Sequence, residues 1–481
     1  MTATAAIKFG TSGWRAIIAD EYTFPNLRLV CHAIAATLAD TDKTGAPLAI
    51  GYDTRFQSEA FAAEAARVLA SHGFRCLVST TPIPTPAVAH AIRHMSLTGA
   101  INITASHNPA EWNGLKFSTD QGAPAPPGLT RAVEDEAARL AASADRERLC
   151  APQSAPPEVA ARIETADFRD AYIAQIDRLV RFDLIRKAGF SVALDPRWGA
   201  GRGYYDEILR RHGIPFTMLH DTRDVTFGGE GPDVSERTLK ELSKAVVDSG
   251  HAIGLACDGD ADRFGVVDAD GTWINPNLLL ALLADYLAES RGLRQGLGRT
   301  YATTGLIDAV ARHHGVPVHQ TPVGFKYLGE LILAEKVYLA GEESAGLSII
   351  GHVPEKDGIL GGLLAAEMVA ARGCGIRQNL QALFAKVGPM YSKRQDFRVT
   401  PEQTARLRAH MKSPPATVGG LRAAKTTVLD GLRLDFDDGA WLLMRPSGTE
   451  PVVRYYVEAP TEPGLATLAA AGRKALIGDD A

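Results

Sequence analysis

The sequence contains no long uninterrupted apolar run. Of its 481 residues, 46% are hydrophobic and 22% are charged, and no apolar stretch approaches the roughly 20 residues that a membrane-spanning helix needs. The N-terminal segment "MTATAAIKFGTSGWR" lacks the basic region, apolar core and small-residue cleavage site of a secretory signal. These absences favour a cytoplasmic protein with no membrane partner.

Cysteine and excess positive charge are also scarce. The five cysteines are scattered and include no C-x-x-C pair, which argues against a disulfide framework and against a zinc site; they are Cys31, Cys76, Cys150, Cys257 and Cys374. The formal net charge of -5 provides no basic surplus for gripping a nucleic-acid backbone. We therefore expect reduced thiols, no nucleic-acid partner and a small-molecule ligand.

Three segments of the chain share a strand–helix–Gly–strand pattern. In each, a glycine stands where a helix C-cap needs a positive φ, and a β-rich run follows it. The segments are "LAIGYDTRFQSEAFAAEAARVLASHGFRCLVST", "SVALDPRWGAGRGYYDEILRRHGIPFTMLH" and "TYATTGLIDAVARHHGVPVHQT". They predict three related α/β domains, because their separation is far longer than a solenoid repeat.

Composition suggests where these domains begin and end. The Pro-rich "CAPQSAPPEV" (Cys150–Val159) is typical of an exposed connection. After Ala385 the pattern changes to short β-like runs followed by one helix, as in a smaller α+β domain. We expect an α/β fold with four domains, at residues 1–152, 153–270, 271–387 and 388–481.

The stretch "TASHNP" raises the question of whether Ser106 is a nucleophile or a turn residue. Ser, Asn and Pro commonly terminate strands and form turns. The G-x-S-x-G elbow of serine hydrolases occurs nowhere in the chain. If Ser106 reacts, another group must activate it.

The stretch "DGDADR" places Asp258, Asp260 and Asp262 between two β-like runs. In an extended loop, alternate side chains point the same way, so three carboxylates converge. An EF-hand is excluded, because Arg263 and Ala269 occupy the positions of its Gly and its bidentate Glu. Oxygen ligands with open coordination positions favour Mg²⁺, and a solvated acidic turn is the alternative.

The stretch "MRPSGTEP" has the composition of a phosphate clamp. Arg445 offers a guanidinium fork, Ser447 and Thr449 offer hydroxyls, and Gly448 permits close approach of backbone N–H groups to an anion. An ordinary turn is the alternative.

The stretch "GEESAG" carries two adjacent carboxylates, Glu342 and Glu343, in a glycine-bounded loop. Carboxylates accept hydrogen bonds well from sugar hydroxyls. The motif alone is a weak signal.

A dinucleotide-binding fold is a rival interpretation. Gly199 and Gly201 lie between a strand and a helix, with Asp221 about twenty residues further on. The third glycine of the fingerprint would stand at Tyr204, so these glycines are better interpreted as turn residues. An NAD-dependent enzyme therefore remains only as a third hypothesis.

Taken together and in order, the four loops resemble those of the α-D-phosphohexomutase family. "TASHNP" resembles its phosphoserine loop, "DGDADR" its metal loop, "GEESAG" its sugar-recognition loop and "RPSGTEP" its phosphate loop, and "GTSGWR" and "NGLK" also fit its pattern. The resemblance spans nearly the whole chain. It implies an enzyme that exchanges phosphate between hexose 1-phosphate and hexose 6-phosphate, with Mg²⁺, a phosphoserine and a hexose 1,6-bisphosphate that also serves as activator.

The resemblance also implies roles for individual residues. Ser106 would carry the phosphate and, with the three aspartates, bind the metal. The implied sets are Lys116, His107, Arg15 and Arg263 for proton transfer and charge stabilisation; Glu342, Glu343 and Ser344 for the sugar; and Arg445, Ser447, Gly448, Thr449 and Lys356 for phosphate. A monomer or a homodimer is compatible with these roles.

Two features bear on which hexose is used. Members of the family that act on both glucose and mannose phosphates commonly end the sugar loop with a histidine, where this chain has Gly346. "EKDG" (Glu355–Gly358) resembles phosphoglucomutase-type members. These features favour glucose 1-phosphate; mannose 1-phosphate, dual activity and a sugar-phosphate binding protein without turnover are the alternatives.

Overall fold

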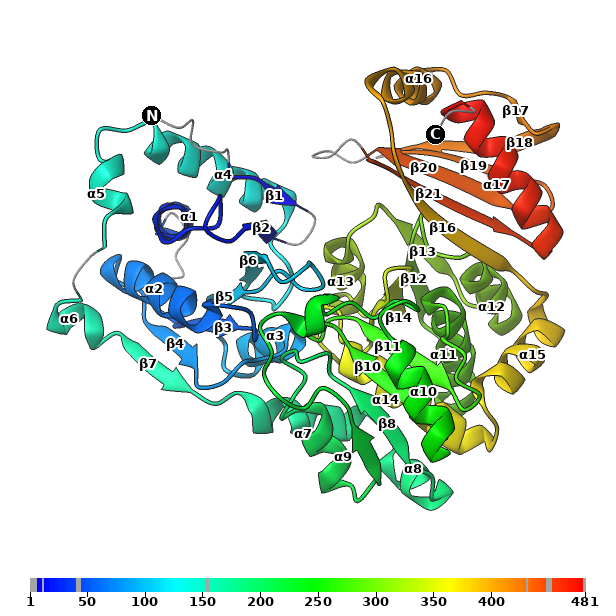
Figure 1. Ribbon diagram of the computed structural model, residues 1–481, viewed down its shortest axis with the longest axis horizontal. Coiled ribbons are helices and arrows are strands. Elements are labelled where there is room, and N and C mark those ends of the chain that lie inside the picture. The colour runs from blue at the N-terminus through cyan, green and yellow to red at the C-terminus, as the bar shows by residue number, and fades with distance from the viewer. Residues whose placement is uncertain are drawn as a thin grey trace. The chain divides into compact units, whose positions relative to one another are not determined.

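The computed structural model describes residues 7–10, 13–39, 45–152, 155–429, 431–446 and 452–478. The chain forms two compact units: Met1–Pro276 with Gly324–Ile376, and Asn277–Val323 with Arg377–Ala481. Most elements of both units are labelled in Figure 1.

The first unit contains a seven-stranded mixed sheet of order β1-β2-β6-β5-β3-β4-β7. β5, β3, β4 and β7 run parallel, whereas β1, β2 and β6 pair antiparallel. The strands are β1 (Phe9–Gly10), β2 (Gly13–Ile17), β3 (Leu48–Tyr52), β4 (Cys76–Ser79), β5 (Gly99–Ile103), β6 (Trp112–Thr119) and β7 (Ile163–Ala166). The helices of this part are α1 (Phe24–Ala39), α2 (Ser58–Ser71), α3 (Thr85–His94), α4 (Pro127–Ala141), α5 (Arg146–Cys150) and α6 (Pro157–Ala160).

A second sheet of the first unit has the order β11-β10-β8-β9. β8 runs parallel to β9 and to β10, and β10 and β11 form an antiparallel pair. The strands are β8 (Val192–Asp195), β9 (Phe216–Met218), β10 (Ile253–Cys257) and β11 (Phe264–Asp268). The helices are α7 (Arg169–Leu179), α8 (Phe182–Ala188), α9 (Tyr205–Arg211) and α10 (Lys240–Ser249), with a 3₁₀ turn at Phe227–Gly229.

The first unit is completed by a hairpin and two helices. These elements are α13 (Phe325–Leu333), β14 (Val337–Glu342), β15 (Gly346–Ile349) and α14 (Gly358–Arg372). The side chain of Asp357 caps α14 by accepting a hydrogen bond from the Leu360 N–H. The apolar sequence of α14 is almost entirely buried, so this helix belongs to the core of the unit.

The second unit contains the third parallel strand pair and a six-stranded antiparallel sheet of order β16-β21-β20-β19-β18-β17. Its first elements are α11 (Pro276–Arg291), which begins at the last residue of the first unit, β12 (Gly296–Thr300), α12 (Leu306–His314) and β13 (Val318–Thr321). The remaining elements are α15 (Ile376–Val387), β16 (Tyr391–Arg398), α16 (Pro401–Lys412), β17 (Thr417–Val418), β18 (Leu421–Val428), β19 (Leu432–Phe436), β20 (Trp441–Pro446), β21 (Val452–Ala459) and α17 (Glu462–Leu476).

The three predicted strand–helix–strand segments are confirmed as β3–α2–β4, β8–α9–β9 and β12–α12–β13, each with parallel strands. The glycine after each helix has the expected positive φ: 94° at Gly73, 64° at Gly213 and 67° at Gly315. The smaller C-terminal α+β part is also confirmed. β7 lies beyond the boundary predicted at residue 152 and pairs with β4, so the first sheet extends across that boundary.

No single helix in the described part of the chain is long and apolar enough to cross a membrane. One bent pair, Gly358–Arg372 with Ile376–Val387, meets the length and composition requirement only when its two helices are taken together.

Candidate active site

Ser106 lies in the loop that follows β5 and is 1% exposed. Its backbone is left-handed, with φ 54°, and its N–H donates to Thr104 Oγ1 at 2.9 Å. The Ser106 hydroxyl donates to Asp258 Oδ2 at 2.8 Å. The fold therefore brings the first and second of the predicted loops into direct contact across 152 residues of sequence.

Arg55 holds this serine loop from inside the domain. Its guanidinium is completely buried and donates to the carbonyl oxygens of Ser106, Asn108, Pro109 and Trp112 at 2.5 to 3.0 Å. Each of these carbonyls would otherwise have to find another partner in a water-poor environment. Arg55 thus fixes the backbone that presents the Ser106 hydroxyl.

The acidic loop between β10 and β11 brings its three carboxylates together. One ligand oxygen from each of Asp258, Asp260 and Asp262 lies within 4.8 Å of the others, so the predicted convergence is correct. The predicted extended backbone is wrong. The loop turns, because the Ala261 N–H donates to the Asp258 carbonyl at 2.9 Å and Ala261 has φ 57°.

The electrostatics of this cluster fit a hard cation. Burial, followed by repulsion from Asp262 and Asp260, raises the pKa of Asp258 well above its ordinary value. The Oδ1 atoms of Asp260 and Asp262 are buried and have no hydrogen-bond partner among the described residues. Such oxygens are the ligands that Mg²⁺ prefers, so the residues present suit the metal that the sequence predicts.

Two buried lysines face the acidic cluster. Lys116, on β6, contacts Asp260 Oδ2 at 2.5 Å and Asp262 Oδ2 at 2.7 Å. Burial alone would lower the pKa of Lys116, but Asp260 and Asp262 outweigh it and the net shift is upward. Lys356 lies 3.2 Å from Asp262 Oδ2 and 3.0 Å from Glu355 Oε1. Both ammonium groups therefore lie beside the carboxylates of the acidic cluster.

The other predicted catalytic side chains lie around Ser106. Arg15, on β2, donates to Asn108 Oδ1 at 3.1 Å, and His107 Nδ1 lies 3.4 Å from Ser106 Oγ. Burial, with Arg263 and Arg15 nearby, lowers the pKa of His107 well below its ordinary value. Arg263 contributes its backbone N–H to Asp258 Oδ1 at 3.0 Å. The structure thus assembles all five predicted catalytic residues in the first unit.

The predicted sugar residues form the tip of the β14–β15 hairpin. Glu342 pairs with Gly346, leaving a three-residue loop that carries Glu343 and Ser344. The Phe264 N–H donates to the Ala345 carbonyl at 2.9 Å, which links this loop to the end of the metal loop. Burial, followed by repulsion from Glu343, raises the pKa of Glu342 to about 7.

Gly346 has a packing role that the sequence does not reveal. A Cβ atom built there would lie 2.2 Å from Cδ of Lys356 and 2.7 Å from its Cγ. The aliphatic part of Lys356 therefore occupies the space that a side chain at position 346 would need. A side chain at position 346 and the present position of Lys356 are therefore sterically incompatible.

The predicted phosphate loop belongs to the second unit. Arg445 is half-buried near the end of β20, opposite Arg454 of β21. Ser447, Gly448 and Thr449 lie outside the described residues.

The glycines of the rival dinucleotide interpretation pack against the metal loop. A Cβ at Gly199 would lie 2.7 Å from the Gly259 carbonyl oxygen, and a Cβ at Gly201 would lie 2.4 Å from Cys257 Sγ. Close packing against β10 and the acidic loop accounts for both glycines.

Sequence reasoning missed three contributors to the site. Arg55 lies in the first strand–helix–strand segment, whose pattern does not indicate its contacts with the serine loop. Thr85, at the start of α3, donates from its hydroxyl to Asp260 Oδ2 and from its N–H to the Asp260 carbonyl. Glu355 pairs with Lys356. Thr85 had no signal in the sequence, whereas Glu355 adjoins the Lys-Asp-Gly motif.

Comparison with known families accounts for nearly the whole chain. Models of the phosphoglucomutase/phosphomannomutase family match in order: α/β/α domain I at residues 6–143, α/β/α domain II at 170–271, α/β/α domain III at 275–387 and the C-terminal domain at 398–475. Four matches in this order agree with the predicted architecture of three α/β domains and a smaller C-terminal domain.

Individual relatives differ in the sugar that their names specify. The chain is 30% identical to a phosphoglucomutase of Komagataeibacter xylinus, over 95% of this chain and 88% of that protein. It is 30% identical to a phosphoglucosamine mutase of Salinispora arenicola, over 94% of both chains. A putative phosphomannomutase structure from Thermus thermophilus superimposes with a TM-score of 0.82 at 30% identity, covering 98% of this chain and 99% of the other. Equal identity to different mutases does not select the sugar.

Proposed function

The chain belongs to the phosphoglucomutase/phosphomannomutase family, and we propose that it interconverts hexose 1-phosphate and hexose 6-phosphate through a phosphoserine at Ser106. The observation that carries this proposal is the contact between Ser106 Oγ and Asp258 within the three-carboxylate cluster. A serine whose hydroxyl lies against a cation site can exchange a phosphoryl group without a strong base beside it.

The predicted catalytic and metal-binding residues of the first unit each have a part in this proposed reaction. Asp258, Asp260 and Asp262 would hold Mg²⁺, which when bound supplies positive charge to offset the charge on the serine oxygen as phosphate leaves. Lys116 lies within hydrogen-bond distance of two of these carboxylates and is the candidate for proton transfer to and from the sugar hydroxyl. Arg15, His107 and Arg263 surround the serine and stabilise charge.

The intermediate would be a hexose 1,6-bisphosphate that turns around in the site and returns its other phosphate to Ser106. The phosphate that does not react must be bound in both orientations. Arg445, with Ser447, Gly448 and Thr449, supplies the donors for that purpose, and Lys356 is a further phosphate contact. Glu342 and Glu343 would accept hydrogen bonds from the ring hydroxyls, and the Ser344 hydroxyl would donate or accept.

Glucose 1-phosphate is the preferred substrate in this proposal. The aliphatic part of Lys356 fills the space beside Gly346, and its ammonium group pairs with Asp262 and Glu355. The site therefore lacks the imidazole that dual-specificity relatives commonly carry at the position of Gly346. A neutral imidazole both donates and accepts hydrogen bonds, and Gly346 has no side chain to do either. A changed donor set discriminates between epimers, because the wrong epimer leaves buried polar groups unpaired.

The phosphoserine is tested by mass and by turnover. Intact-mass analysis of the active enzyme should show one phosphate, which Ser106→Ala removes together with turnover. Ser96→Ala is a matched control, because Ser96 also has a left-handed φ, 52°, and is exposed. Full activity of Ser106→Ala would disprove the mechanism.

The metal site has its own test. Asp260→Asn neutralises one of three converging carboxylates and should weaken Mg²⁺ activation. Unchanged metal dependence of the rate would remove Asp260 from the ligand set.

The substrate is tested by comparing kcat/KM for glucose 1-phosphate, mannose 1-phosphate and glucosamine 1-phosphate at saturating Mg²⁺ and glucose 1,6-bisphosphate. The highest value for glucose 1-phosphate supports the proposal, and an equal or higher value for either of the other two contradicts it. Binding of all three without turnover would indicate a non-catalytic sugar-phosphate binding protein.

A further inference from the structure

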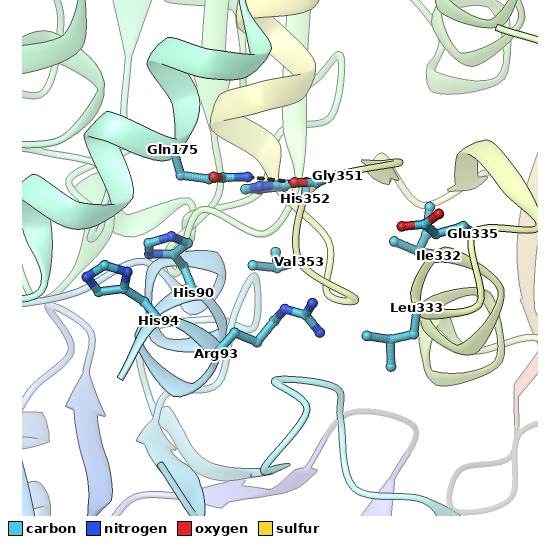
Figure 2. Close-up of a pocket in the computed structure, with 10 residues that line it drawn as sticks. All are labelled: His90, Arg93, His94, Gln175, Ile332, Leu333, Glu335, Gly351, His352 and Val353. Atoms are coloured by element: carbon cyan, nitrogen blue, oxygen red, sulfur yellow. Dashed lines mark hydrogen bonds between the residues drawn. The ribbon is translucent and has the colours of Figure 1, made fainter. Parts of the chain in front are cut away.

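A second cavity lies in the first unit, lined by none of the active-site residues described above. Its volume is about 270 Å³. The C-terminal half of α3 lines it with His90, Arg93 and His94, α7 with Gln175, and the segment before α14 with His352 (Figure 2). We call it the α3 cavity.

Two of its histidines are buried and incompletely hydrogen-bonded. His90 is 7% exposed and His352 is 6% exposed, and Nδ1 of each has no hydrogen-bond partner among the described residues. Burial, together with His352 and His94, lowers the pKa of His90 to about 4. At neutral pH its imidazole is therefore uncharged and carries one N–H donor.

The charges around the cavity favour an anion over a cation. Arg93 is exposed at the lining, and Figure 2 draws its guanidinium between His90 and Leu333. One nitrogen, Nη1, donates to the Gln121 carbonyl at 3.4 Å, and the other N–H groups of the guanidinium have no hydrogen-bond partner among the described residues. Arg178, on α7, is close enough to His90 to lower its pKa. Among the described lining residues the acidic one is Glu335, which is exposed to solvent. The nearby Asp357 is hydrogen-bonded to Tyr172 and His352.

Asp357 Oδ2 lies 2.8 Å from His352 Nε2 and accepts from the Tyr172 hydroxyl at 2.8 Å. Asp357 does not line the cavity, and its carboxylate faces Tyr172, His352 and the Leu360 N–H instead. A metal ion is also disfavoured, because in the described part of the chain only the three aspartates of the active site bring three ligand atoms within 4.8 Å.

We propose that the α3 cavity binds a small phosphate-bearing anion. Arg93 offers a guanidinium group and His90 offers one imidazole N–H to the phosphate oxygens. His352 donates its Nε2–H to Asp357, so its Nδ1 accepts a hydrogen bond from a protonated phosphate oxygen. The volume lies just below the roughly 300–1,000 Å³ of typical ligand pockets, so the ligand is smaller than a typical drug.

Both walls of the cavity connect to the metal loop. α3 begins at Thr85, which binds Asp260, and ends at the cavity. On the other wall, His352 binds Asp357, whose neighbour Lys356 contacts Asp262. A bound anion would therefore touch two segments that hold the catalytic carboxylates, which gives the site a route to influence turnover.

The test uses the full chain with Ser106→Ala and isotope-labelled histidine side chains. Saturating glucose 1,6-bisphosphate occupies the active site, and inorganic phosphate is then titrated while the imidazole NMR signals are followed. His90→Gln and His352→Gln assign the signals. Arg93→Gln removes the proposed anion contact, and Arg148→Gln, an exposed arginine elsewhere in the unit, is the matched control.

We expect saturable shifts of the His90 and His352 signals, a phosphate affinity about tenfold weaker in Arg93→Gln, and no change in Arg148→Gln. The absence of a saturable shift would overturn the proposal, as would equal affinity in Arg93→Gln or shifts caused by Zn²⁺ but not by phosphate. None of these readouts depends on turnover, so failure here is distinct from failure of the mutase mechanism.

Discussion

The first two strand–helix–strand repeats end their first strands with the same device. Asp53-Thr-Arg55 follows β3 and Asp195-Pro-Arg197 ends β8. In each, the arginine N–H donates to the aspartate Oδ1, at 3.0 Å and 2.8 Å. The guanidinium groups of Arg55 and Arg197 lie 3.1 Å and 3.6 Å from the aspartate Oδ2. Each also lies over an aromatic ring, Phe227 at 5.1 Å and Trp198 at 5.0 Å.

The repeats differ in what the rest of each guanidinium holds. Arg55 binds four carbonyls of the serine loop, whereas Arg197 donates to one carbonyl, that of Gly231, at 3.0 Å. The next residue, Pro232, accepts a hydrogen bond from the Gly259 N–H of the metal loop at 3.1 Å. The same Asp–Arg pair therefore serves two purposes. In the first repeat it holds the serine loop directly, and in the second it supports the metal loop through the Gly231–Pro232 backbone.

The largest effect is expected for Arg55→Ala. The change leaves Asp53 and four carbonyls without their buried partner, so the free energy of unfolding should fall by about 3–5 kcal/mol. Turnover should fall at least about 100-fold, because small misplacements of reacting groups cost this much. Denaturant unfolding and steady-state kinetics measure the two effects.

Arg55→Lys sharpens the same test. It retains a charge opposite Asp53 but loses the planar fork that reaches several carbonyls. Recovery of stability without recovery of kcat would show that the carbonyl contacts position Ser106. Full recovery of kcat would refute that role.

A smaller effect is expected for Gly199→Ala, in the turn after Arg197. The added Cβ would lie 2.7 Å from the Gly259 carbonyl and 3.0 Å from that of Asp258, so the metal loop must shift. The Mg²⁺ concentration needed for half-maximal activity should rise about tenfold, as expected when one ligand is displaced. Gly128→Ala, which meets no atom within 4 Å, is the control and should leave this value unchanged.

Arg197→Ala should separate stability from catalysis. Its buried ion pair with Asp195 resembles that of Arg55, so a loss of about 3 kcal/mol of unfolding free energy is expected. Turnover should fall only a few-fold, because Arg197 contacts no carbonyl of the serine loop in the described structure. A loss of kcat as large as that of Arg55→Ala would abolish the distinction between the repeats.

The smallest effect concerns pH. Asp195 has a titratable partner, His220 Nδ1 at 2.8 Å, whereas Asp53 is bound by the Ser58 hydroxyl. Burial lowers the pKa of His220, but the hydrogen bond to Asp195 and the negative charges of Asp195 and Glu241 together outweigh burial, and the net shift is upward. This stabilisation is complete below the unfolded pKa and is lost as the pH rises through the folded pKa.

The contribution of His220 should stay below about 1 kcal/mol, because the group is only half buried. The free energy of unfolding should be measured between the unfolded and folded pKa of His220. It should depend less on pH in His220→Asn than in the unaltered protein. An unchanged pH profile would show that His220 does not titrate against Asp195. Ser58→Ala, in the first repeat, should leave the pH profile as it is.

The sequence predicted the features that depend on local patterns. The three strand–helix–strand segments and their positive-φ glycines follow from spacing along a few residues. The three aspartates gather as predicted, but through a turn and not through the predicted extended loop. The turn at Ala261 was missed because its left-handed backbone allows the loop to reverse, and no residue type there signals it.

Long-range contacts explain what the sequence could not predict. Arg55 meets its carbonyl partners 51 to 57 residues away, and Thr85 meets Asp260 at a separation of 175 residues. Such pairings depend on how β3, β5 and β10 are arranged. The clash between a side chain at Gly346 and Lys356 likewise appears only when both residues have been placed.

The left-handed backbone of Ser106 limits which amino acid can carry the phosphate. Serine and threonine share a hydroxyl of similar reactivity, and protein chemistry often exchanges them. A left-handed φ costs L-residues about 1–2 kcal/mol, and for a β-branched residue it is a genuine outlier. Threonine at position 106 would therefore pull the loop away from the geometry that Arg55 imposes, and the choice of nucleophile is made by the main chain as much as by its chemistry.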